Sequence, residues 1–448
     1  MDVKGKEILV VGCGVTGIST ARFLAESKAK VTLTDYKSKL DLRHLLEPLE
    51  KYDIKYDLGT YIQKRFNDSD LIVVSPGVPF DLEPLEIAIN KGVPVISEIE
   101  LASRFIRKPI IAIAGTNGKT TTSELVAKMI ENDGDKVFLG GNIGKPLVDY
   151  LIEKPKVKHI VCEISSYQLE ACKTFRPQVA ALLNVTPDHL DRHGTFEEYV
   201  AVKGLVFENQ TQDDVAVLNY DDRVVKDLGL HIQSEALFFS KYPFEGEGIH
   251  YEDMKLMFHS KKFGKKQLEL QNMKLKGIHN LENIMAASSI AFSLGVSKKA
   301  VQKTIDEFKG LEHRFEFVAR KNRVNFFNDS KGTNIDSIAK ILQNFSRPVI
   351  LIAGGREKGG DYSVLKDIIH QKVKMLILMG EAKEKLNRVL GDYTETFVVG
   401  TLEEAVLYAY QKSRFDDNIV FCPGCSSHDM YTNYAERGEA FKKLVFNL

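Results

Sequence analysis

Residues 110–122 read Ile110-Ile111-Ala112-Ile113-Ala114-Gly115-Thr116-Asn117-Gly118-Lys119-Thr120-Thr121-Thr122, and a stretch that favours a helix follows them. A strand, a glycine-rich turn and a helix in this order are typical of a parallel α/β sheet that binds phosphate groups. The glycines let backbone N–H groups close around phosphate oxygens, and the helix directs its positive end at them. Lys119 adds a charge and the Thr120 hydroxyl can bind Mg²⁺, although Ile113 stands where the first glycine of the standard loop would be. The stretch predicts an ATP site made by Gly115, Thr116, Asn117, Gly118, Lys119, Thr120 and Thr121.

The length and charge of the chain narrow the class of protein. At 448 residues it exceeds what one hydrophobic core usually supports, so two or three domains are expected. Lys and Arg together number 61, as do Asp and Glu, which leaves no overall basic field to attract nucleic acid or an anionic membrane. No apolar run approaches the roughly 20 residues of a membrane span. We therefore predict a cytoplasmic protein that binds small molecules, without a nucleic-acid partner or membrane insertion.

Upstream of the phosphate loop, residues 1–100 alternate predicted strands and helices, with strands at 7–11, 30–34, 71–75 and 93–96 and a helix over 20–27. Gly12, Gly14 and Gly17 follow the first strand, and Asp35 ends the second. This spacing matches the dinucleotide fingerprint, which is typical of NAD binding. The same turn also suits other nucleotide diphosphates, and its glycines could serve only to let the helix pack closely on the strand. The segment alone leaves these three interpretations open.

Downstream of the loop, apolar strands continue to alternate with helical stretches, and residues 240–270 favour a small antiparallel excursion. Strands are predicted at 157–164, 179–184, 214–219, 324–328, 349–353, 374–379, 396–399 and 419–422. The predicted fold is α/β with three domains, each a mostly parallel sheet with flanking helices. They comprise a Rossmann-like N-terminal domain at 1–100, a central domain of the phosphate-loop ATPase type at 101–310, and a Rossmann-like C-terminal domain at 311–448.

Several polar stretches follow predicted strands, where parallel sheets place their sites. Glu163 ends one strand and is a candidate Mg²⁺ ligand, and His189 lies in the polar stretch 184–193. Lys203, on the next predicted helix, would on its own be interpreted as a solvated surface lysine. Three further loops have donors and cations suited to carboxylates and phosphates, at 327–334, 354–360 and 423–427. Cys422 and Cys425 have C-x-x-C spacing, but no second cysteine pair or histidine cluster lies nearby in the sequence, so reduced thiols are expected.

With these residues in view, the whole chain resembles the Mur ligases, the ATP-dependent amide-bond-forming enzymes of bacterial cell-wall precursor synthesis. The motifs that carry the resemblance are the loop at 115–120, the stretch 184–192, His279-Asn280 with Asn283, residues 312–314, and residues 328–331. Within the family, the glycine turn at residue 12 and the ending from Ser426 to Gly438 resemble the members that add D-glutamate.

The resemblance implies roles for residues that spacing alone does not assign. The residues expected to bind the UDP-substrate are Val15, Thr16, Asp35, Gly77 and Asn142, and those expected to bind ATP are Lys119, Thr120, Asn280, Asn283, Arg314 and Asp329. Metal ligands are expected at Glu163, His189 and Thr120. The residues expected to bind D-glutamate are Thr333, Lys358, Ser427 and Tyr434. Lys203 matches a lysine that is carbamylated in relatives, which turns a cation into a metal-bridging anion. Two Mg²⁺ ions are expected, Lys331 is expected in the catalytic machinery, and the protein is expected to be a monomer.

The implied reaction transfers the ATP γ-phosphoryl group to the carboxylate of UDP-N-acetylmuramoyl-L-alanine, after which D-glutamate attacks the acyl phosphate. A related ligase for another amino acid is the main alternative. An NAD-dependent oxidoreductase would leave the phosphate loop and the third segment without a role. A non-catalytic nucleotide switch would turn over ATP without dependence on a D-amino acid.

Overall fold

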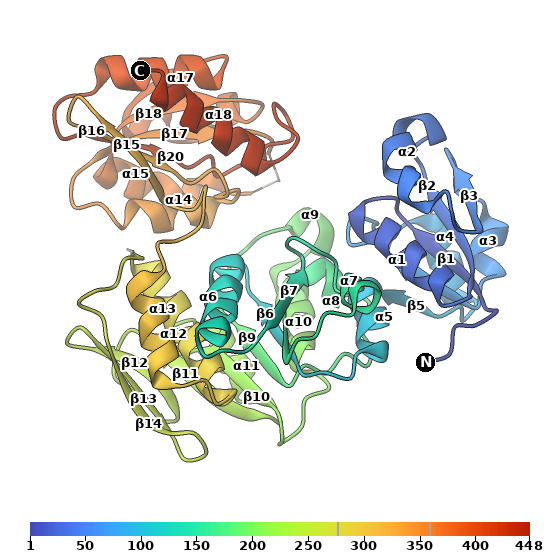
Figure 1. The fold of residues 1–448 in the computed structure, drawn as a ribbon. Coiled ribbons are helices and arrows are strands. Elements are labelled where there is room, and N and C mark those ends of the chain that lie inside the picture. The colour runs from blue at the N-terminus through green and yellow to red at the C-terminus, as the bar shows by residue number, and fades with distance from the viewer. Residues whose placement is uncertain (276, 358–359) are drawn as a thin grey trace. The chain divides into compact units, whose positions relative to one another are not determined.

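The computed structural model describes residues 1–275, 277–357 and 360–448, which group into two compact units. The first unit holds Met1–Val185, Glu197–Gln271 and Glu282–Thr304, and the second holds Thr186–Phe196, Asn272–Leu281 and Ile305–Leu448. Across the described residues the strands form three sheets flanked by helices (Figure 1). The predicted fold class, three α/β domains with mostly parallel sheets, is confirmed. The boundaries near residues 100 and 310 stay a prediction.

The N-terminal sheet is parallel throughout, with strand order β3-β2-β1-β4-β5. Its buried centre is the apolar run of β1 beside that of β4, and α3 and α4 pack residues such as Phe66 and Leu85 against one face. The strands are β1 (Glu7–Val11), β2 (Lys30–Asp35), β3 (Ile54–Leu58), β4 (Leu71–Val74) and β5 (Val95–Ser97). The helices are α1 (Val15–Glu26), α2 (Lys39–Leu46), α3 (Gln63–Asn67), α4 (Glu83–Asn90) and α5 (Glu98–Phe105).

The central sheet contains the phosphate loop and has the order β14-β13-β12-β11-β10-β9-β6-β8-β7. Its strands are parallel from β7 to β12, and β13 and β14 add the antiparallel excursion predicted for residues 240–270. The strands are β6 (Ile110–Ala114), β7 (Val137–Gly141), β8 (His159–Glu163), β9 (Val179–Leu182), β10 (Val215–Asn219), β11 (Glu235–Ser240), β12 (Gly248–Glu252), β13 (Lys255–Ser260) and β14 (Gly264–Glu269). The helices between residues 119 and 307 are α6 (Lys119–Asn132), α7 (Asp149–Glu153), α8 (Ser166–Leu169), α9 (Leu190–His193), α10 (Phe196–Gly204), α11 (Arg223–Gly229), α12 (Ile278–Ser293) and α13 (Lys298–Glu307).

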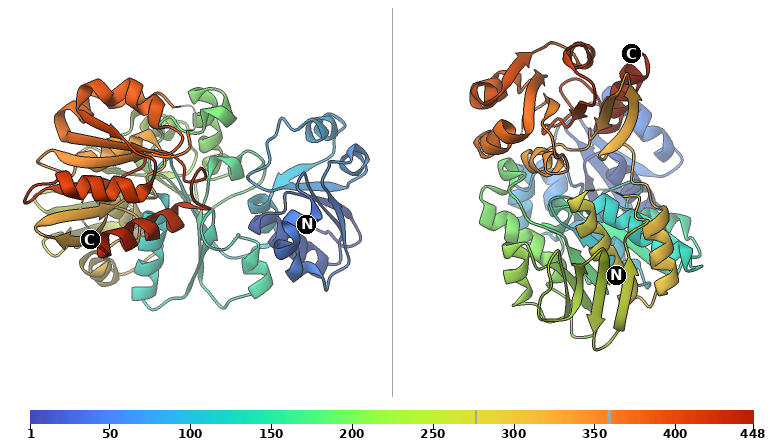
Figure 2. Two further views of the ribbon diagram at one scale, coloured as in Figure 1. Left: turned by 90° about the horizontal axis from the view of Figure 1, so that it is seen from above. Right: turned by 90° about the vertical axis from the view of Figure 1, so that its left-hand side faces the viewer.

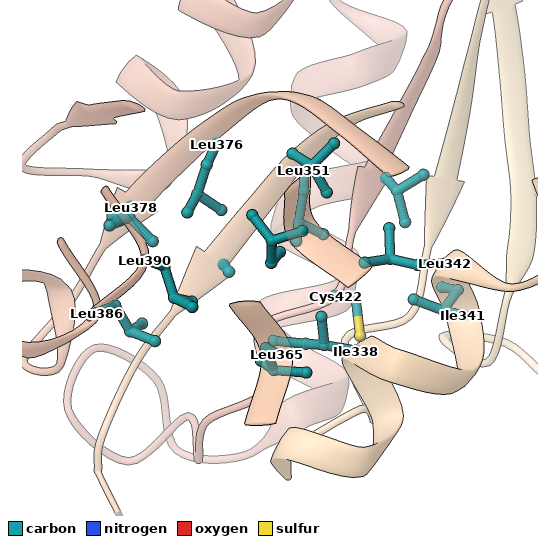
Figure 3. Packing of buried hydrophobic residues seen from close by; sticks show 14 of the residues in the cluster. Ile338, Ile341, Leu342, Leu351, Leu365, Leu376, Leu378, Leu386, Leu390 and Cys422 are labelled. Carbon is teal, nitrogen blue, oxygen red and sulfur yellow. The ribbon is translucent and has the colours of Figure 1, made fainter. Parts of the chain in front are cut away.

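The C-terminal sheet has the order β15-β16-β20-β17-β18-β19 and is covered on both faces. Figure 3 shows Leu351, Leu376 and Leu378 of the sheet meeting side chains of α14 and α16. On the other face α17 and α18 lie side by side (Figure 2). The strands are β15 (Glu316–Lys321), β16 (Val324–Asn328), β17 (Val349–Gly354), β18 (Val373–Met379), β19 (Glu395–Val398) and β20 (Asn418–Phe421). The helices are α14 (Ile335–Leu342), α15 (Lys366–Lys372), α16 (Lys383–Leu390), α17 (Leu402–Lys412) and α18 (Tyr434–Phe446).

Several details differ from the sequence-based expectations: strands β3, β7, β11 and β15 were not predicted, and two further differences concern α1 and one edge of the C-terminal sheet. Helix α1 begins at Val15, directly after the glycine turn, whereas the helix was expected only from residue 20. The pair β15–β16 is antiparallel, so the C-terminal sheet is mixed at one edge. The earlier start of α1 matters for function because it brings the N-terminal N–H groups of a helix directly to the glycine turn.

Candidate active site

The phosphate loop joins the end of β6 to the first residue of α6, Lys119. Gly115 and Gly118 have φ angles of 145° and 87°, which side chains other than glycine rarely adopt. A Cβ at Gly118 would also lie 2.3 Å from Oδ1 of Asn283. The loop therefore needs glycine at residue 118 both for its backbone conformation and for the close approach of α12.

Asn184, just beyond β9, holds the loop in place. Its carbonyl accepts the N–H of Thr116 at 2.9 Å, and its Oδ1 accepts the N–H of Asn117 at 2.8 Å. Its Nδ2 donates back to the Asn117 carbonyl at 3.1 Å. The sequence predicts ligating side chains in the stretch 184–193, but it does not predict this bracing role for Asn184. Its position at the end of the neighbouring strand was the available signal.

Two lysine ammonium groups converge on the loop carbonyls. Lys119 Nζ donates to the carbonyls of Gly115 and Thr116 at 2.9 Å each, and Lys203 Nζ donates to Gly115 at 2.9 Å. Lys203 is only 2% exposed and lies 4.9 Å from the ring centroid of Tyr199, whose hydroxyl is 3.1 Å from Thr116 Oγ1. The interpretation of Lys203 as a surface lysine is therefore wrong. Tyr199 was not expected at the site from the sequence.

Glu163, at the end of β8, links the loop to the next strand. Thr120 Oγ1 donates to Glu163 Oε2 at 2.7 Å, and Asn142 Nδ2 donates to Glu163 Oε1 at 2.8 Å. Glu163 is 2% exposed and Thr120 7% exposed. A carboxylate beside a hydroxyl at a helix N-terminus supplies the hard oxygen ligands that Mg²⁺ prefers, so these residues fit the ion that the loop sequence implies.

A cavity of about 720 Å³ opens at the glycine turn of the N-terminal sheet. All five residues expected at the UDP-substrate line it: Val15, Thr16, Asp35, Gly77 and Asn142. Asn142 thus lines the cavity and is also hydrogen-bonded to Glu163. This hydrogen bond connects the cavity to the phosphate loop within one compact unit.

Asp35 and the glycines also have structural roles at this cavity. Oδ2 of Asp35 accepts the N–H of Cys13 at 2.7 Å, and Oδ1 accepts the N–H of Lys37 at 2.9 Å. A Cβ at Gly17 would lie 1.7 Å from the Gly12 carbonyl oxygen. Close packing of helix on strand is therefore one function of this glycine pattern, alongside any ligand contact.

His189 belongs to the second compact unit, whereas Glu163 and Lys203 belong to the first. It has φ 55°, and its N–H donates to Asp188 Oδ1 at 3.0 Å. Its Nε2 lies 3.7 Å from Asp188 Oδ2, which accepts Nδ2 of Asn334 at 3.1 Å. His189 and Thr333 both line a second cavity, of about 650 Å³. Of the expected metal set, the structure directly joins Thr120 and Glu163.

The remaining expected ATP residues are Asn280, Asn283, Arg314 and Asp329. Asn280 and Asn283 are three residues apart on α12, which places them on one helix face, and Asn283 Oδ1 accepts Thr122 Oγ1 at 3.3 Å. Burial raises the pKa of Asp329, while the Phe315 N–H, Cys422 and Arg314 act in the opposite direction.

The remaining C-terminal residues gather around a buried guanidinium. Lys331 Nζ lies 4.7 Å from the Tyr434 ring centroid, and Ser427 is 3% exposed. The guanidinium of Arg437 donates to the carbonyls of Ser330, Cys425 and Ser426 at 2.8–3.2 Å, which holds the loops at 330 and 425 together. Arg437 is a functional candidate that the sequence analysis did not single out. Lys358 lies outside the described residues.

The structure also bears on two possible metal or redox sites. Cys422 and Cys425 are free thiols, and burial raises the pKa of Cys425 to about 11. Glu312, His313 and Glu439 are the one ligand-like cluster among the described residues. Lys442 Nζ already lies 3.0 Å from Glu312 and 3.1 Å from Glu439, so an ammonium group neutralises these carboxylates.

Comparison with known proteins gives a consistent result along the chain. Residues 6–97 match the Mur ligase MurD-like N-terminal domain, 113–291 the Mur ligase middle domain, and 313–425 the Mur ligase glutamate ligase domain. Proteins named UDP-N-acetylmuramoylalanine–D-glutamate ligase from Geotalea daltonii and Thermoanaerobacter sp. are 44% and 41% identical to it. The alignments cover 99% and 100% of this chain and 98% and 100% of those proteins.

Solved structures agree at the level of the fold. MurF from Acinetobacter baumannii superposes with a TM-score of 0.61 at 16% identity, covering 99% of this chain and 91% of that one. A pseudomurein peptide ligase type C from Methanothermus fervidus gives 0.60 at 20% identity, covering 99% and 100%. None of the helices in the described part of the chain combines the length and apolar character that crossing a membrane requires.

Proposed function

The chain belongs to the Mur ligase family, and we propose that it is the ATP-dependent ligase that joins D-glutamate to UDP-N-acetylmuramoyl-L-alanine in peptidoglycan precursor synthesis. The observation that carries the proposal is the hydrogen-bonded series Thr120–Glu163–Asn142, which runs from the phosphate loop to the cavity at the glycine turn. Such a connection suits a reaction between a nucleoside triphosphate and a nucleotide-linked substrate. The choice of D-glutamate rests on the names of full-length relatives.

In this proposal each sheet has one ligand. Residues 1–100, with Asn142, bind the UDP-substrate. Residues 101–310 bind ATP, and residues 311–448 supply the D-glutamate site through Thr333, Lys358, Ser427 and Tyr434. Asn280, Asn283, Arg314 and Asp329 complete the ATP site. The protein is proposed to act as a cytoplasmic monomer.

The first step transfers the γ-phosphoryl group of ATP to the substrate carboxylate, giving ADP and an acyl phosphate. Two anions must approach each other, and the loop N–H groups, the N-terminus of α6 and Lys119 offset their repulsion. Donors placed in this way contribute about 3 kcal/mol each to lowering such barriers. The N–H groups at the start of α1 are placed to bind the diphosphate of the other substrate, which keeps its reacting carboxylate positioned.

The second step is attack of the D-glutamate amine on the acyl phosphate. The tetrahedral intermediate collapses to the amide with loss of inorganic phosphate. Lys331, beside Tyr434, supplies a positive charge for the phosphate or the amino-acid carboxylates. Arg437 holds the loops at 330 and 425 in register for this step, through its bonds to their carbonyls.

Magnesium, when bound, neutralises phosphate charge in this family of reactions. Thr120 and Glu163 would hold an ion, and His189 and a carbamylated Lys203 are proposed as further metal ligands, with two ions in all. The burial of Lys203 against Tyr199 supports this assignment, and its bond to the Gly115 carbonyl is compatible with it, because a carbamate keeps one N–H for that bond. The number of ions and the carbamate are part of the proposal.

The test is phosphate release with ATP, Mg²⁺ and UDP-N-acetylmuramoyl-L-alanine. D-Glutamate is compared with L-glutamate, L-alanine, L-lysine and no amino acid. Release with D-glutamate alone is the expected result. Release with another amino acid would indicate a related ligase with a different acceptor. Absence of release with every acceptor, together with tight NAD binding, would overturn the ligase assignment.

A further inference from the structure

Glu98 is a buried carboxyl group at the junction of the first two sheets. It follows β5 directly, begins α5 and is 1% exposed. Oε1 accepts the N–H of Val148 at 2.5 Å, while no described residue donates a hydrogen bond to Oε2. Burying a carboxyl group with only part of its hydrogen bonding satisfied costs folding free energy. A functional role for Glu98 would explain why a carboxyl group stands at this buried position.

Val148 ends the loop that forms one wall of the substrate cavity. This loop runs from β7 to α7, and Asn142, Gly144 and Pro146 within it line the cavity. At its beginning Asn142 is bonded to Glu163 through both its N–H and its side chain. At its end Leu147 and Val148 are buried, and two contacts reach the N-terminal domain: Glu98 accepts the N–H of Val148, and Ser19 of α1 is hydrogen-bonded to Asp149 of α7. Glu98 is therefore one of two side chains that attach the loop end to the N-terminal domain, and it is the one that binds the loop backbone directly.

Glu100, two residues further on, provides a contrast on the same helix. It is equally buried, but its carboxylate accepts the N–H groups of Lys173 and Thr174 and the Thr174 hydroxyl, and it pairs with Arg104. Lys173 and Thr174 do not line the substrate cavity. Glu100 thus connects the same two sheets without touching the cavity loop, whereas Glu98 holds the loop itself.

We propose that Glu98 is a positioning residue for the UDP-substrate: by holding Val148 it fixes the loop 142–148 in the form that completes the cavity wall. This inference rests on the proposed function for the identity of the substrate. When the Glu98 contact is lost, only a fraction of molecules has the loop in the binding-competent form, and the apparent affinity falls by that fraction. ATP, which binds at the phosphate loop, is not affected by this loss.

The environment of Glu98 makes the contact depend on pH. Burial raises its pKa to about 7, Asp149 adds to the rise, and the N–H groups of Val148 and Leu147 act against it. Cys162 of β8 and Cys172 beyond α8 also face it, while Lys145 and Arg22 act on Asp149. An ionised carboxylate is the stronger acceptor for the Val148 N–H, so the loop is held best above pH 7.

The experiment compares Glu98→Ala, Glu98→Gln and the control Glu100→Gln with the wild type. Calorimetric titration with UDP-N-acetylmuramoyl-L-alanine and separately with ATP gives two dissociation constants. For Glu98→Ala we expect the first to rise about tenfold, with an unchanged kcat and an unchanged constant for ATP. Glu98→Gln keeps an acceptor for Val148, so we expect a rise of about threefold at pH 8 that disappears by pH 6, where the wild-type carboxyl is neutral.

Hydrogen exchange tests the loop contact without any ligand. The amides of residues 142–148 should exchange faster in Glu98→Ala and keep the wild-type rate in Glu100→Gln. Equal substrate affinity in wild type and Glu98→Ala would overturn the inference, as would parallel losses for both ligands. If Glu98→Ala fails to fold, a pH-independent difference between Glu98→Gln and wild type overturns it. Failure of the wild type to bind the UDP-substrate would instead overturn the proposed function.

Discussion

The chain presents a glycine turn before a helix twice, at residues 12–14 before α1 and at 115–118 before α6. Both turns place helix N–H groups at the end of a parallel strand. The first turn itself contains no charged residue and opens on a cavity of about 720 Å³. The second receives two lysine ammonium groups and is linked through Thr120 to the carboxylate of Glu163. This difference matches the proposed function, in which the first turn binds the diphosphate of one substrate and the second binds the phosphate that reacts.

The two turns also differ in the side chain that holds their backbone in place. At the first, Asp35 uses both carboxylate oxygens to hold backbone N–H groups of Cys13 and Lys37, and Gly17 lets α1 approach the Gly12 carbonyl. At the second, Asn184 performs the bracing with a neutral amide. Glu163 therefore does not have to brace the loop backbone, which leaves its carboxylate suited to a metal ion.

Removal of Lys119 should have the largest effect on activity. For Lys119→Ala we expect kcat to fall by about a thousandfold or more, because the charge acts on the phosphoryl group as it is transferred. Lys128→Ala is the matched control, since Lys128 lies on the same helix and pairs with Glu131 at the surface. Thermal unfolding should show that both variants fold. Near-normal turnover in Lys119→Ala would remove the distinction between the two turns.

Lys203 tests whether the second turn needs a buried cation or a buried anion. Lys203→Ala should lower kcat by about a hundredfold or more. If the lysine is carbamylated, acetate or propionate should partly restore phosphate release, because either acid can place a carboxylate in the space left by the missing lysine side chain. Methylammonium and ethylammonium serve as the comparison. Rescue by the amines alone would show that Lys203 acts as the cation seen on the Gly115 carbonyl.

Asp35 tests the bracing of the first turn. Asp35→Asn keeps the size of the side chain but replaces one acceptor oxygen by a donor that faces the N–H of Cys13 or Lys37. We expect KM for the UDP-substrate to rise about tenfold while KM for ATP stays unchanged. Steady-state kinetics with each substrate varied in turn gives both values. Equal changes in the two would mean that the turns are not independent.

The sequence predicted the parallel core strands well because they are continuous apolar runs. β16 was placed at its observed bounds, and β6 was placed directly before the loop. Strands β3, β7, β11 and β15 were not predicted, and three of them, β3, β7 and β15, lie at a sheet edge. Half-exposed edge strands bury little apolar surface, so their pattern is weak in the sequence.

The site divides along a similar line. Glu163 ends β8 and Asn142 follows β7, and they are brought together because neighbouring parallel strands end at one sheet edge. Glu163 was expected from its place at a strand end, whereas Asn142 was expected only from the family resemblance. Tyr199, Arg437 and Glu98 act through other residues, and their roles depend on contacts with segments remote in sequence. No spacing rule reports such contacts. The burial of Lys203 was likewise not predicted, because its helix α10 has acidic residues in the first turn and resembles an exposed helix in sequence.

The smallest effect is expected for Lys37, the exposed cation in the cavity wall of the first turn. If backbone N–H groups and the N-terminus of α1 hold the diphosphate, Lys37→Ala should raise KM for the UDP-substrate by about threefold at low salt, and by less at 0.5 M salt, where screening weakens exposed charges. ATP kinetics should not change. A fall in affinity as large as that in Asp35→Asn, persisting at high salt, would mean that the first turn also depends on a lysine, and its contrast with the second turn would then be one of degree.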